Sequence, residues 1–359
     1  MSVQQFIPKP YTASVKNGSF KWSSPSNIAL VKYWGKKEDQ IPENPSLSFT
    51  LSDCKTITNL IFSEKQNQDN FSFEVFLDDD KKDDFKPKIE TFFKRVEVFL
   101  PFLRHYHFKI ETSNTFPHSS GIASSASGMS ALALCLMSLE KALNNEVSDE
   151  FFIKKASFLA RLGSGSACRS LEGDTVVWGH HNEIKGSSDL FGTKYPFEVH
   201  DNFKNYQDTI LLVDKGEKQV SSTVGHNLMH GHPFASKRFS QAHKNLSNLI
   251  TILNDGDLDA FIKIVESEAL TLHAMMMTSM PYFILMKPNT IEIIYKIWGY
   301  RETSNSKICF TLDAGANVHV LYPEYETESV MKFIKNELVV YCQNGHYICD
   351  KIGFGAKQL

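Results

Sequence analysis

The chain lacks the features that mark several common classes of protein. It has 359 residues, a formal net charge of −3 and no block of basic residues, so nucleic acid is not an expected partner. The longest strongly apolar run, Ala131 to Met137, is far shorter than the ~20 residues that a membrane helix needs. The N-terminal stretch lacks the apolar core of a signal peptide. We therefore expect no membrane partner and a cytoplasmic location.

Paired cysteines and metal motifs are also missing. The six cysteines are scattered, and no two form a C-x-x-C pair, so reduced thiols are the expected state. The segment "GHNLMHGH" contains His226, His230 and His232 but lacks the glutamate of the H-E-x-x-H zinc motif. A zinc site is therefore not predicted.

The apolar pattern predicts strands and helices mixed in both halves of the chain. The length suggests about two domains, and we place their boundary in a weakly periodic polar segment, giving domains 1–203 and 204–359. The pattern shows no regular β-α-β alternation, which favours an α+β fold over a doubly wound parallel sheet. The predicted strands are 55–64, 71–80, 106–114, 209–213, 307–313 and 317–323. The predicted helices are 87–103, 124–143, 148–162, 234–253, 258–273, 289–298 and 328–338.

A hydroxyl-rich loop, "PHSSGIASSASG", runs directly into the apolar helix predicted at 124–143. The free N–H groups and positive dipole at a helix start attract anions. Ser124, Ser125 and Ser127 add hydroxyls that could donate to a phosphate or bind a metal. The loop matches neither the Walker motif nor G-x-G-x-x-G. Either it binds phosphate, or it is a start of small residues packed against a sheet.

Two lysines, Lys32 and Lys36, bracket an aromatic pair in "SNIALVKYWGKK". In a strand, Lys32 and Trp34 would share one face while Tyr33 points to the other. Lysines beside aromatics in an apolar strand suit an anionic ligand lodged against the sheet. They equally suit long side chains whose charged ends reach solvent.

Two further segments carry chemistry-bearing residues. Asp313 in "TLDAGANVHV" follows an apolar strand, but an aspartate that merely forms a turn is common. The stretch "GSGSACRSLEGD" offers an anion site, a catalytic cysteine or only a tight loop. The nearest histidines to Cys168, in "GHH" at 179–181, are distant in sequence, so a small buried cysteine is favoured over a nucleophile. Arg169 is better placed, because a guanidinium can grip a carboxylate or phosphate with two parallel hydrogen bonds.

Together these segments resemble the diphosphomevalonate decarboxylase family, a branch of the superfamily of galactokinase, homoserine kinase, mevalonate kinase and phosphomevalonate kinase. The matches run in the family's order from about residue 20 to about residue 320. The segments that carry the resemblance are "NIALVKYWGK", "IPENPSLSFTL", "FPHSSGIASSASG", "GSGSACRSLEGD", "SSTVGH", "LHA" and "LDAGAN".

The resemblance implies a fold and an activity. The fold is that of small-molecule kinases, with an N-terminal domain like ribosomal protein S5, a C-terminal ferredoxin-like α/β sandwich and an active site in the cleft between them. The activity is the decarboxylation of mevalonate 5-diphosphate to isopentenyl diphosphate, with ATP and Mg²⁺, in isoprenoid biosynthesis. Phosphorylation of the 3-hydroxyl makes it a good leaving group before CO2 departs. A homodimer is also implied.

The resemblance assigns roles to residues. Asp313 would orient or deprotonate the 3-hydroxyl. Lys32 would keep the Asp313 carboxylate ionised or stabilise the transferring phosphoryl group. Arg169 would hold the substrate carboxylate. The residues implied in substrate binding are Asn27, Tyr33, Lys36, Ser164, Ser166, Ser222 and Thr223. The residues implied in ATP binding are Asn114, Gly121, Ser124, Ser125 and Ser127, with Ser125 as a Mg²⁺ ligand.

The sequence departs from the family's pattern at a few positions. His226 stands where the family usually has Met, and Glu172, Asp174, Pro45 and Ala316 replace Tyr, Gly, Ser and Pro. None of these touches the set of Asp313, Lys32 and Arg169, so activity is expected. The alternatives are a relative that acts on mevalonate 5-phosphate, one that stops after 3-phosphorylation, and a catalytically silent ligand-binding protein.

Overall fold

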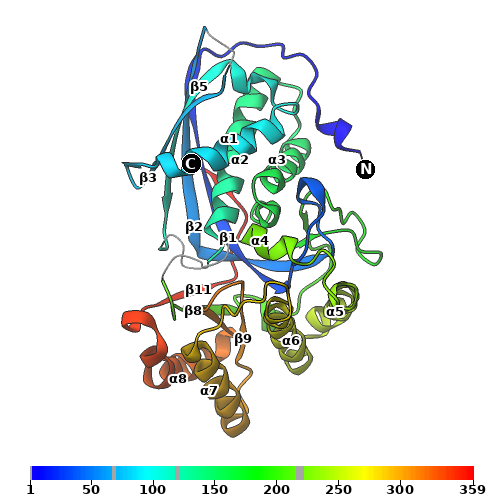
Figure 1. Cartoon of the computed structure of the whole chain (residues 1–359), viewed down its shortest axis with the longest axis vertical. Helices are drawn as coiled ribbons and strands as arrows, with labels where there is room; N and C mark the ends of the chain where they lie inside the picture. The colour runs from blue at the N-terminus through cyan, green and yellow to red at the C-terminus, as the bar shows by residue number, and fades with distance from the viewer. Residues whose placement is uncertain (1, 67–69, 118–121, 216–221) are drawn as a thin grey trace.

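The computed structural model describes residues 2–66, 70–117, 122–215 and 222–359 (Figure 1). Its N-terminal part is a large sheet in which β12, β1, β2, β5, β3 and β4 are neighbours in that order, with β6 on β2 and β7 on β6. The pairs are antiparallel except for β3 and β5, which run parallel. These strands are β1 (Asn17–Val31), β2 (Ser46–Glu64), β3 (Ser72–Leu77), β4 (Asp80–Lys81), β5 (Tyr106–Asn114), β6 (Thr175–Trp178), β7 (Thr193–Lys194) and β12 (Lys357–Gln358).

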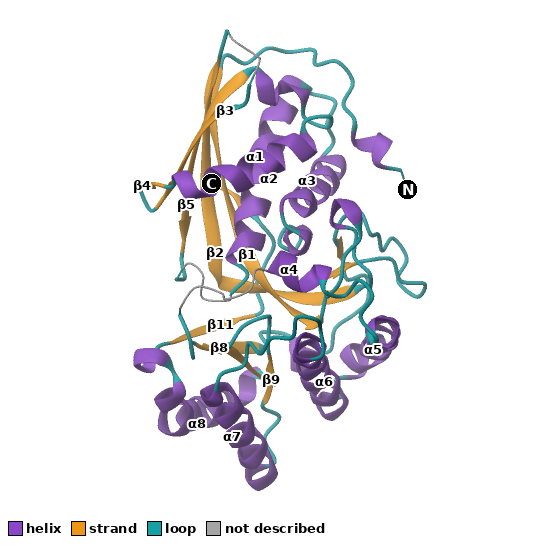
Figure 2. Ribbon diagram, viewed as in Figure 1, coloured by secondary structure: helices purple, strands orange, loops and turns teal. Residues whose placement is uncertain are grey.

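Three helices cover one face of this sheet, namely α1 (Lys86–Val96), α2 (Ser124–Leu143) and α3 (Asp149–Gly163) (Figure 2). The predicted helix 124–143 is confirmed, and it is buried on nearly every side. By length and composition alone α2 could cross a membrane, but 83% of its most apolar window is buried inside the protein, as in a core helix. The predicted cap of α3 is also confirmed, because Ser148 Oγ accepts a hydrogen bond from the N–H of Phe151 at 3.2 Å.

The C-terminal part is a smaller antiparallel sheet in the order β11, β8, β10, β9, with helices packed around it. The chain is therefore a two-domain α+β protein, as predicted. The strands are β8 (Gln207–Leu211), β9 (Cys309–Thr311), β10 (Val318–Tyr322) and β11 (Tyr347–Lys351). The helices are α4 (Ser222–Asn227), α5 (Ala235–Asp255), α6 (Leu258–Met277), α7 (Pro288–Ser304) and α8 (Thr327–Phe333).

The two parts share apolar contacts at the end of the large sheet where β1 finishes. One core cluster joins Ile28 and Leu30 of β1 to Leu246 of α5 and Phe261 of α6. The end of the chain then returns to the large sheet, where β12 pairs with β1. This packing places the end of β1 beside α5 and α6, where the polar site is built. The boundary between residues 203 and 204 stays a prediction.

Candidate active site

A cavity of about 510 Å³ is lined by both halves of the chain: by the segment after β1, by α1 and by the start of α2 on one side, and by α4, α6 and the turn after β9 on the other. A larger surface hollow of about 590 Å³ between α7 and α8 contains none of the residues that the sequence motifs single out. The residues that the motifs single out therefore favour the 510 Å³ cavity as the candidate active site. The predicted site residues that line it are Lys32, Tyr33, Lys36, Ser125, Ser164, Ser166, Arg169 and Asp313.

The centre of the site is an ion pair between Lys32 and Asp313. Lys32 Nζ lies 2.9 Å from Asp313 Oδ1, although the two residues are 281 positions apart in sequence. The lysine side chain is 2% exposed and the aspartate side chain 29%, so the carboxylate opens to the cavity while the ammonium is sealed behind it. Burial lowers the pKa of Lys32, and the carboxylates of Asp313 and Glu268 partly oppose that change.

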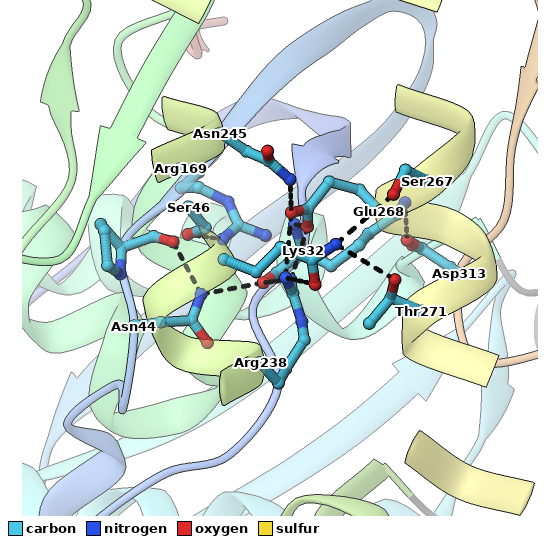
Figure 3. Close-up of polar contacts among 12 residues, drawn as sticks. Lys32, Asn44, Ser46, Arg169, Arg238, Asn245, Ser267, Glu268, Thr271 and Asp313 are labelled. Carbon is cyan, nitrogen blue, oxygen red and sulfur yellow. Dashed lines mark hydrogen bonds and ion pairs between the residues drawn. The ribbon is translucent and has the colours of Figure 1, made fainter. Parts of the chain in front are cut away.

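The structure corrects the expectation that Lys32, Tyr33 and Trp34 continue a strand. Strand β1 ends at Val31, because the N–H of Lys32 donates to the carboxylate of Glu268 on α6 (2.9 Å) instead of to a neighbouring strand (Figure 3). The side chains after Val31 are therefore set by tertiary contacts and not by strand alternation.

Asp313 lies in the turn that follows β9. Its carbonyl accepts hydrogen bonds from the N–H of Gly315 (2.7 Å) and from His273 Nε2 (3.1 Å). Burial lowers the pKa of His273 to about 4, so the ring is neutral at pH 7 and its Nε2 carries the proton that it donates. This anchoring fixes the backbone from which the carboxylate reaches Lys32.

Arg169 is buried and held from one side. Its Nε donates to Asn27 Oδ1 at 3.3 Å, and its Nη1 donates to Ser46 Oγ. Asn27 in turn donates to Ser170 Oγ at 2.8 Å, and the guanidinium lies 5.7 Å from the centre of the Trp178 ring. Two buried cations, Lys32 and Arg169, thus lie on one wall, and such a wall attracts an anion.

The stretch that begins at Gly163 forms a floor of small residues beside Arg169. A Cβ atom at Gly165 would lie 2.9 Å from both the Tyr33 hydroxyl and the Trp178 ring, so any larger residue would displace one of these rings. Ser164 Oγ lies 3.3 Å from Ser125 Oγ, which joins this turn to the start of α2. The absence of bulk therefore lets backbone and hydroxyl groups approach the cavity.

His226 packs against the aromatic pair that follows Lys32. Its ring centre lies 4.2 Å from that of Tyr33 and 4.6 Å from that of Trp34, and its Nδ1 accepts the N–H of Gly35 at 2.9 Å. Burial, with help from the charges of Lys36 and Arg169, lowers the pKa of His226 to about 3. The residue is therefore a neutral imidazole on the cavity wall.

Other predicted residues are less directly connected to the cavity. Asn114 and Ser127 both bond to Thr56, at 2.7 and 2.6 Å, and neither they nor Ser124 line the cavity in the described part of the chain. Gly121 lies outside the described residues. Ser222 and Thr223 begin α4, and their side chains lie outside the description. The roles of these residues stay predictions.

Cys168 does not line the cavity in the described chain, and its Sγ lies 3.1 Å from the carbonyl of Gly165. Burial raises the pKa of this thiol to about 12, so it is not poised as a thiolate nucleophile. The preference for a small buried cysteine fits this environment.

The sequence motifs missed a polar face of α1 that carries two cations. Lys88, Thr91 and Arg95 line the cavity, and Gln40 accepts a hydrogen bond from Lys36 Nζ at 2.9 Å. The spacing of three and then four residues places the α1 residues on one helical face. That spacing was visible in the sequence, but the apolar face of the same helix was the stronger signal.

The donors around the cavity suit phosphate groups better than a bare metal. No group of three or more His, Cys, Asp or Glu side chains that could hold a metal occurs in the described residues. Mg²⁺, however, usually keeps several waters and binds through substrate phosphates and few protein ligands. Ser125, exposed at the start of α2 and lining the cavity, can supply one such ligand.

Comparisons with known proteins agree with this arrangement. Residues 24–190 match the model of the diphosphomevalonate decarboxylase-like N-terminal domain, and residues 209–352 match the mevalonate 5-diphosphate decarboxylase C-terminal domain. A diphosphomevalonate decarboxylase of Ganoderma lucidum is 30% identical over 353 residues, covering 93% of this chain and 85% of the relative. The human enzyme of that name is 26% identical and covers 82% and 74%.

Solved structures give the same result. A mevalonate diphosphate decarboxylase of Staphylococcus aureus superposes with a TM-score of 0.80 at 27% identity, covering 96% of this chain and 98% of the other. A complex with MVAPP, AMPPCP and magnesium superposes with a TM-score of 0.80 at 28% identity, covering 95% and 98%.

Proposed function

Because this chain belongs to the diphosphomevalonate decarboxylase family, we propose that it catalyses the ATP-dependent decarboxylation of mevalonate 5-diphosphate. The products are isopentenyl diphosphate, ADP, phosphate and CO2. The observation that carries this proposal is the Lys32–Asp313 pair, which opens into a cavity that Arg169 also lines. One carboxylate that can take a proton thus faces a wall that can hold anions.

The chemistry proceeds in two steps. In the first, the 3-hydroxyl oxygen attacks the γ-phosphorus of ATP, its proton passes to Asp313, and ADP leaves. In the second, the C3–O bond breaks and phosphate departs, while the electrons of the C–CO2 bond form the new double bond and release CO2. Lys32 keeps the Asp313 carboxylate charged and close to the transferring phosphoryl group.

The remaining contacts hold the substrate in place. Arg169, oriented by Asn27, binds the substrate carboxylate with two parallel hydrogen bonds. Tyr33, Lys36, Ser164 and Ser166 line the cavity and bind the diphosphate end. Ser222 and Thr223 are also assigned to the substrate.

ATP and Mg²⁺ fit the start of α2. The free N–H groups of this helix, together with the hydroxyl of Ser125, favour phosphate oxygens, and Ser125 would be a protein ligand of Mg²⁺. When bound, Mg²⁺ neutralises charge on the phosphates. A related structure in complex with MVAPP, AMPPCP and magnesium supports the binding of ATP and Mg²⁺.

The decisive experiment incubates the protein with ATP, Mg²⁺ and, separately, mevalonate, its 5-phosphate and its 5-diphosphate. Release of ADP and CO2 is measured together. Equal amounts of both from the 5-diphosphate are expected. ADP without CO2 would indicate a 3-kinase, turnover of the 5-phosphate alone would indicate its decarboxylase, and neither product would indicate a silent binding protein.

We further propose a cytoplasmic homodimer. The six cysteines are free thiols, as is typical of proteins in a reducing compartment. Met280, Tyr282 and Ile284 are 80%, 71% and 62% exposed within one short segment, and such apolar side chains favour an interface. Light scattering of the purified protein tests the dimer, and a monomeric mass at assay concentration would overturn it.

A further inference from the structure

The backbone of Lys32 is held by side chains and not by a strand. Its N–H donates to Glu268 Oε2 at 2.9 Å, and its carbonyl accepts from Arg238 Nη2 at 3.1 Å and from Asn44 Nδ2 at 3.0 Å (Figure 3). Both backbone polar groups of this residue are therefore fixed by side chains from α5, from α6 and from the segment before β2. The direction of the lysine side chain follows from that fixation.

Glu268 and Arg238 also bind each other. Arg238 Nη1 donates to Glu268 Oε1 at 2.9 Å and Nη2 donates to Oε2, while Asn245 Nδ2 donates to Oε1 at 2.6 Å. The glutamate is 0% and the arginine 2% exposed. A buried ion pair contributes little to stability compared with apolar residues of the same volume, because its desolvation is costly. Stability alone therefore gives little reason for placing this pair beneath Lys32.

The pair extends a row of alternating charges from the cavity into the C-terminal helices. Asp313 pairs with Lys32 and Glu268 pairs with Arg238, and the two pairs are joined by the hydrogen bond from the backbone N–H of Lys32 to Glu268. The Glu268 carboxylate also acts on the Lys32 ammonium through its charge. A change in one charge therefore alters the balance at the next. The charged and titratable groups that face Lys32 in the described chain are Asp313, Glu268, Arg169, Arg238, His273 and Asp208.

We propose that Glu268 and Arg238 are positioning residues for the reaction, which fix the Lys32 peptide so that its ammonium meets Asp313 and which balance the charge around it. This inference rests on the proposed function, because it assigns a task within that reaction. Neither residue touches the cavity in the described structure. Their effect must therefore pass through Lys32.

The central test is Glu268→Gln, which keeps the shape of the side chain but removes its charge. We expect kcat to fall by about tenfold or more while KM for both substrates changes little, because the binding groups lie elsewhere. Loss of the carboxylate, with Arg238 still charged, disfavours the ammonium of Lys32. The basic limb of the kcat–pH profile should therefore move to lower pH by about one unit.

The double variant Glu268→Gln/Arg238→Met removes both charges. It leaves no unpaired buried ion, so it should fold even if the single variant does not. Its basic limb should move less than that of the single variant, because the repulsion from Arg238 is gone. Its kcat should stay low, because the Lys32 carbonyl loses its contact with Arg238 and keeps only that with Asn44, while its N–H faces an amide instead of a carboxylate.

Glu266→Gln is the matched control. Glu266 lies two positions away on α6, points to nearly the opposite side, and binds Arg301 at 2.7 Å. It should lower the melting temperature without moving the pH profile.

The proposal is overturned if Glu268→Gln leaves the pH limb in place and lowers kcat no more than the control does. It is also overturned if neither variant folds, since the pair would then serve folding. Wild-type protein that releases no ADP or CO2 would instead overturn the proposed function.

Discussion

The two walls of the cavity differ in charge. The wall from the N-terminal half carries Lys32, Lys36, Lys88, Arg95 and Arg169. The wall from the C-terminal half carries Asp313, which is the one carboxylate among the described residues that line the cavity, and the neutral His226.

This difference separates two tasks. A wall of cations holds phosphates and a carboxylate but cannot accept a proton, because charged lysine and arginine side chains have hydrogen-bond donors and no acceptor. A carboxylate without a paired cation would repel the anionic substrates. Asp313 avoids that repulsion because it is paired with Lys32, which belongs to the opposite wall. The ion pair therefore joins the walls, and variants of each wall should fail in different ways.

The largest effect is expected from removing the one carboxylate. Asp313→Asn should fold normally and lose at least about 10³-fold in kcat, because the group acts mainly in the transition state. A coupled assay of ADP release measures this, with melting temperature as the control for folding. Near-full turnover would remove Asp313 from the mechanism.

A smaller loss is expected when the cationic wall keeps its charge but loses its shape. Arg169→Lys should lower kcat/KM by about 10²-fold, because lysine cannot form two parallel hydrogen bonds to a carboxylate. Steady-state kinetics with both substrates measure it. Unchanged kcat and KM would show that Arg169 does not grip the carboxylate.

The neutral residue of the second wall should affect stability more than chemistry. Unfolded His226 binds a proton below pH about 6.5 and the folded residue only near pH 3, so the free energy of unfolding falls as the pH drops through this window. Between pH 8 and pH 5 the contribution of His226 to the free energy of unfolding falls by about 2 kcal/mol.

His226→Met should reduce that loss, as denaturant unfolding at the two pH values would show. The exposed His230 provides the control, since His230→Gln should leave the difference unchanged. An equal pH dependence in wild type and His226→Met would contradict the buried neutral state.

The smallest effect is expected at a residue on neither wall. Cys168→Ser should keep kcat within about twofold of wild type, because a thiol with a raised pKa is not a nucleophile. Complete loss of turnover with the fold intact would restore the catalytic cysteine as a hypothesis.

The predictable parts of the molecule are those with a strong local signal. Helix α2 and strand β5 have the predicted bounds, because the apolar pattern of each segment and the polar residues at its ends indicated the same limits. Loop composition indicated an anion site at Ser124, Ser125 and Ser127, and of these Ser125 lines the cavity in the described chain. The resemblance, not the loop composition, added Ser164 and Ser166, which also line it. Glu268 could not be found in this way, because it is one of two glutamates in a mostly apolar helix, and no local pattern distinguishes it from Glu266.

By itself the sequence determined the elements and the chemistry that each loop can offer, since periodicity and turn residues act over a few neighbouring positions. The resemblance then suggested that Lys32, Arg169 and Asp313 act together. Only the tertiary structure decided that β1 stops at Val31, that Glu268 takes over its next hydrogen bond, and that Lys32 meets a residue 281 positions away. Such contacts depend on how two sheets and their helices pack against each other, and no local pattern encodes that packing.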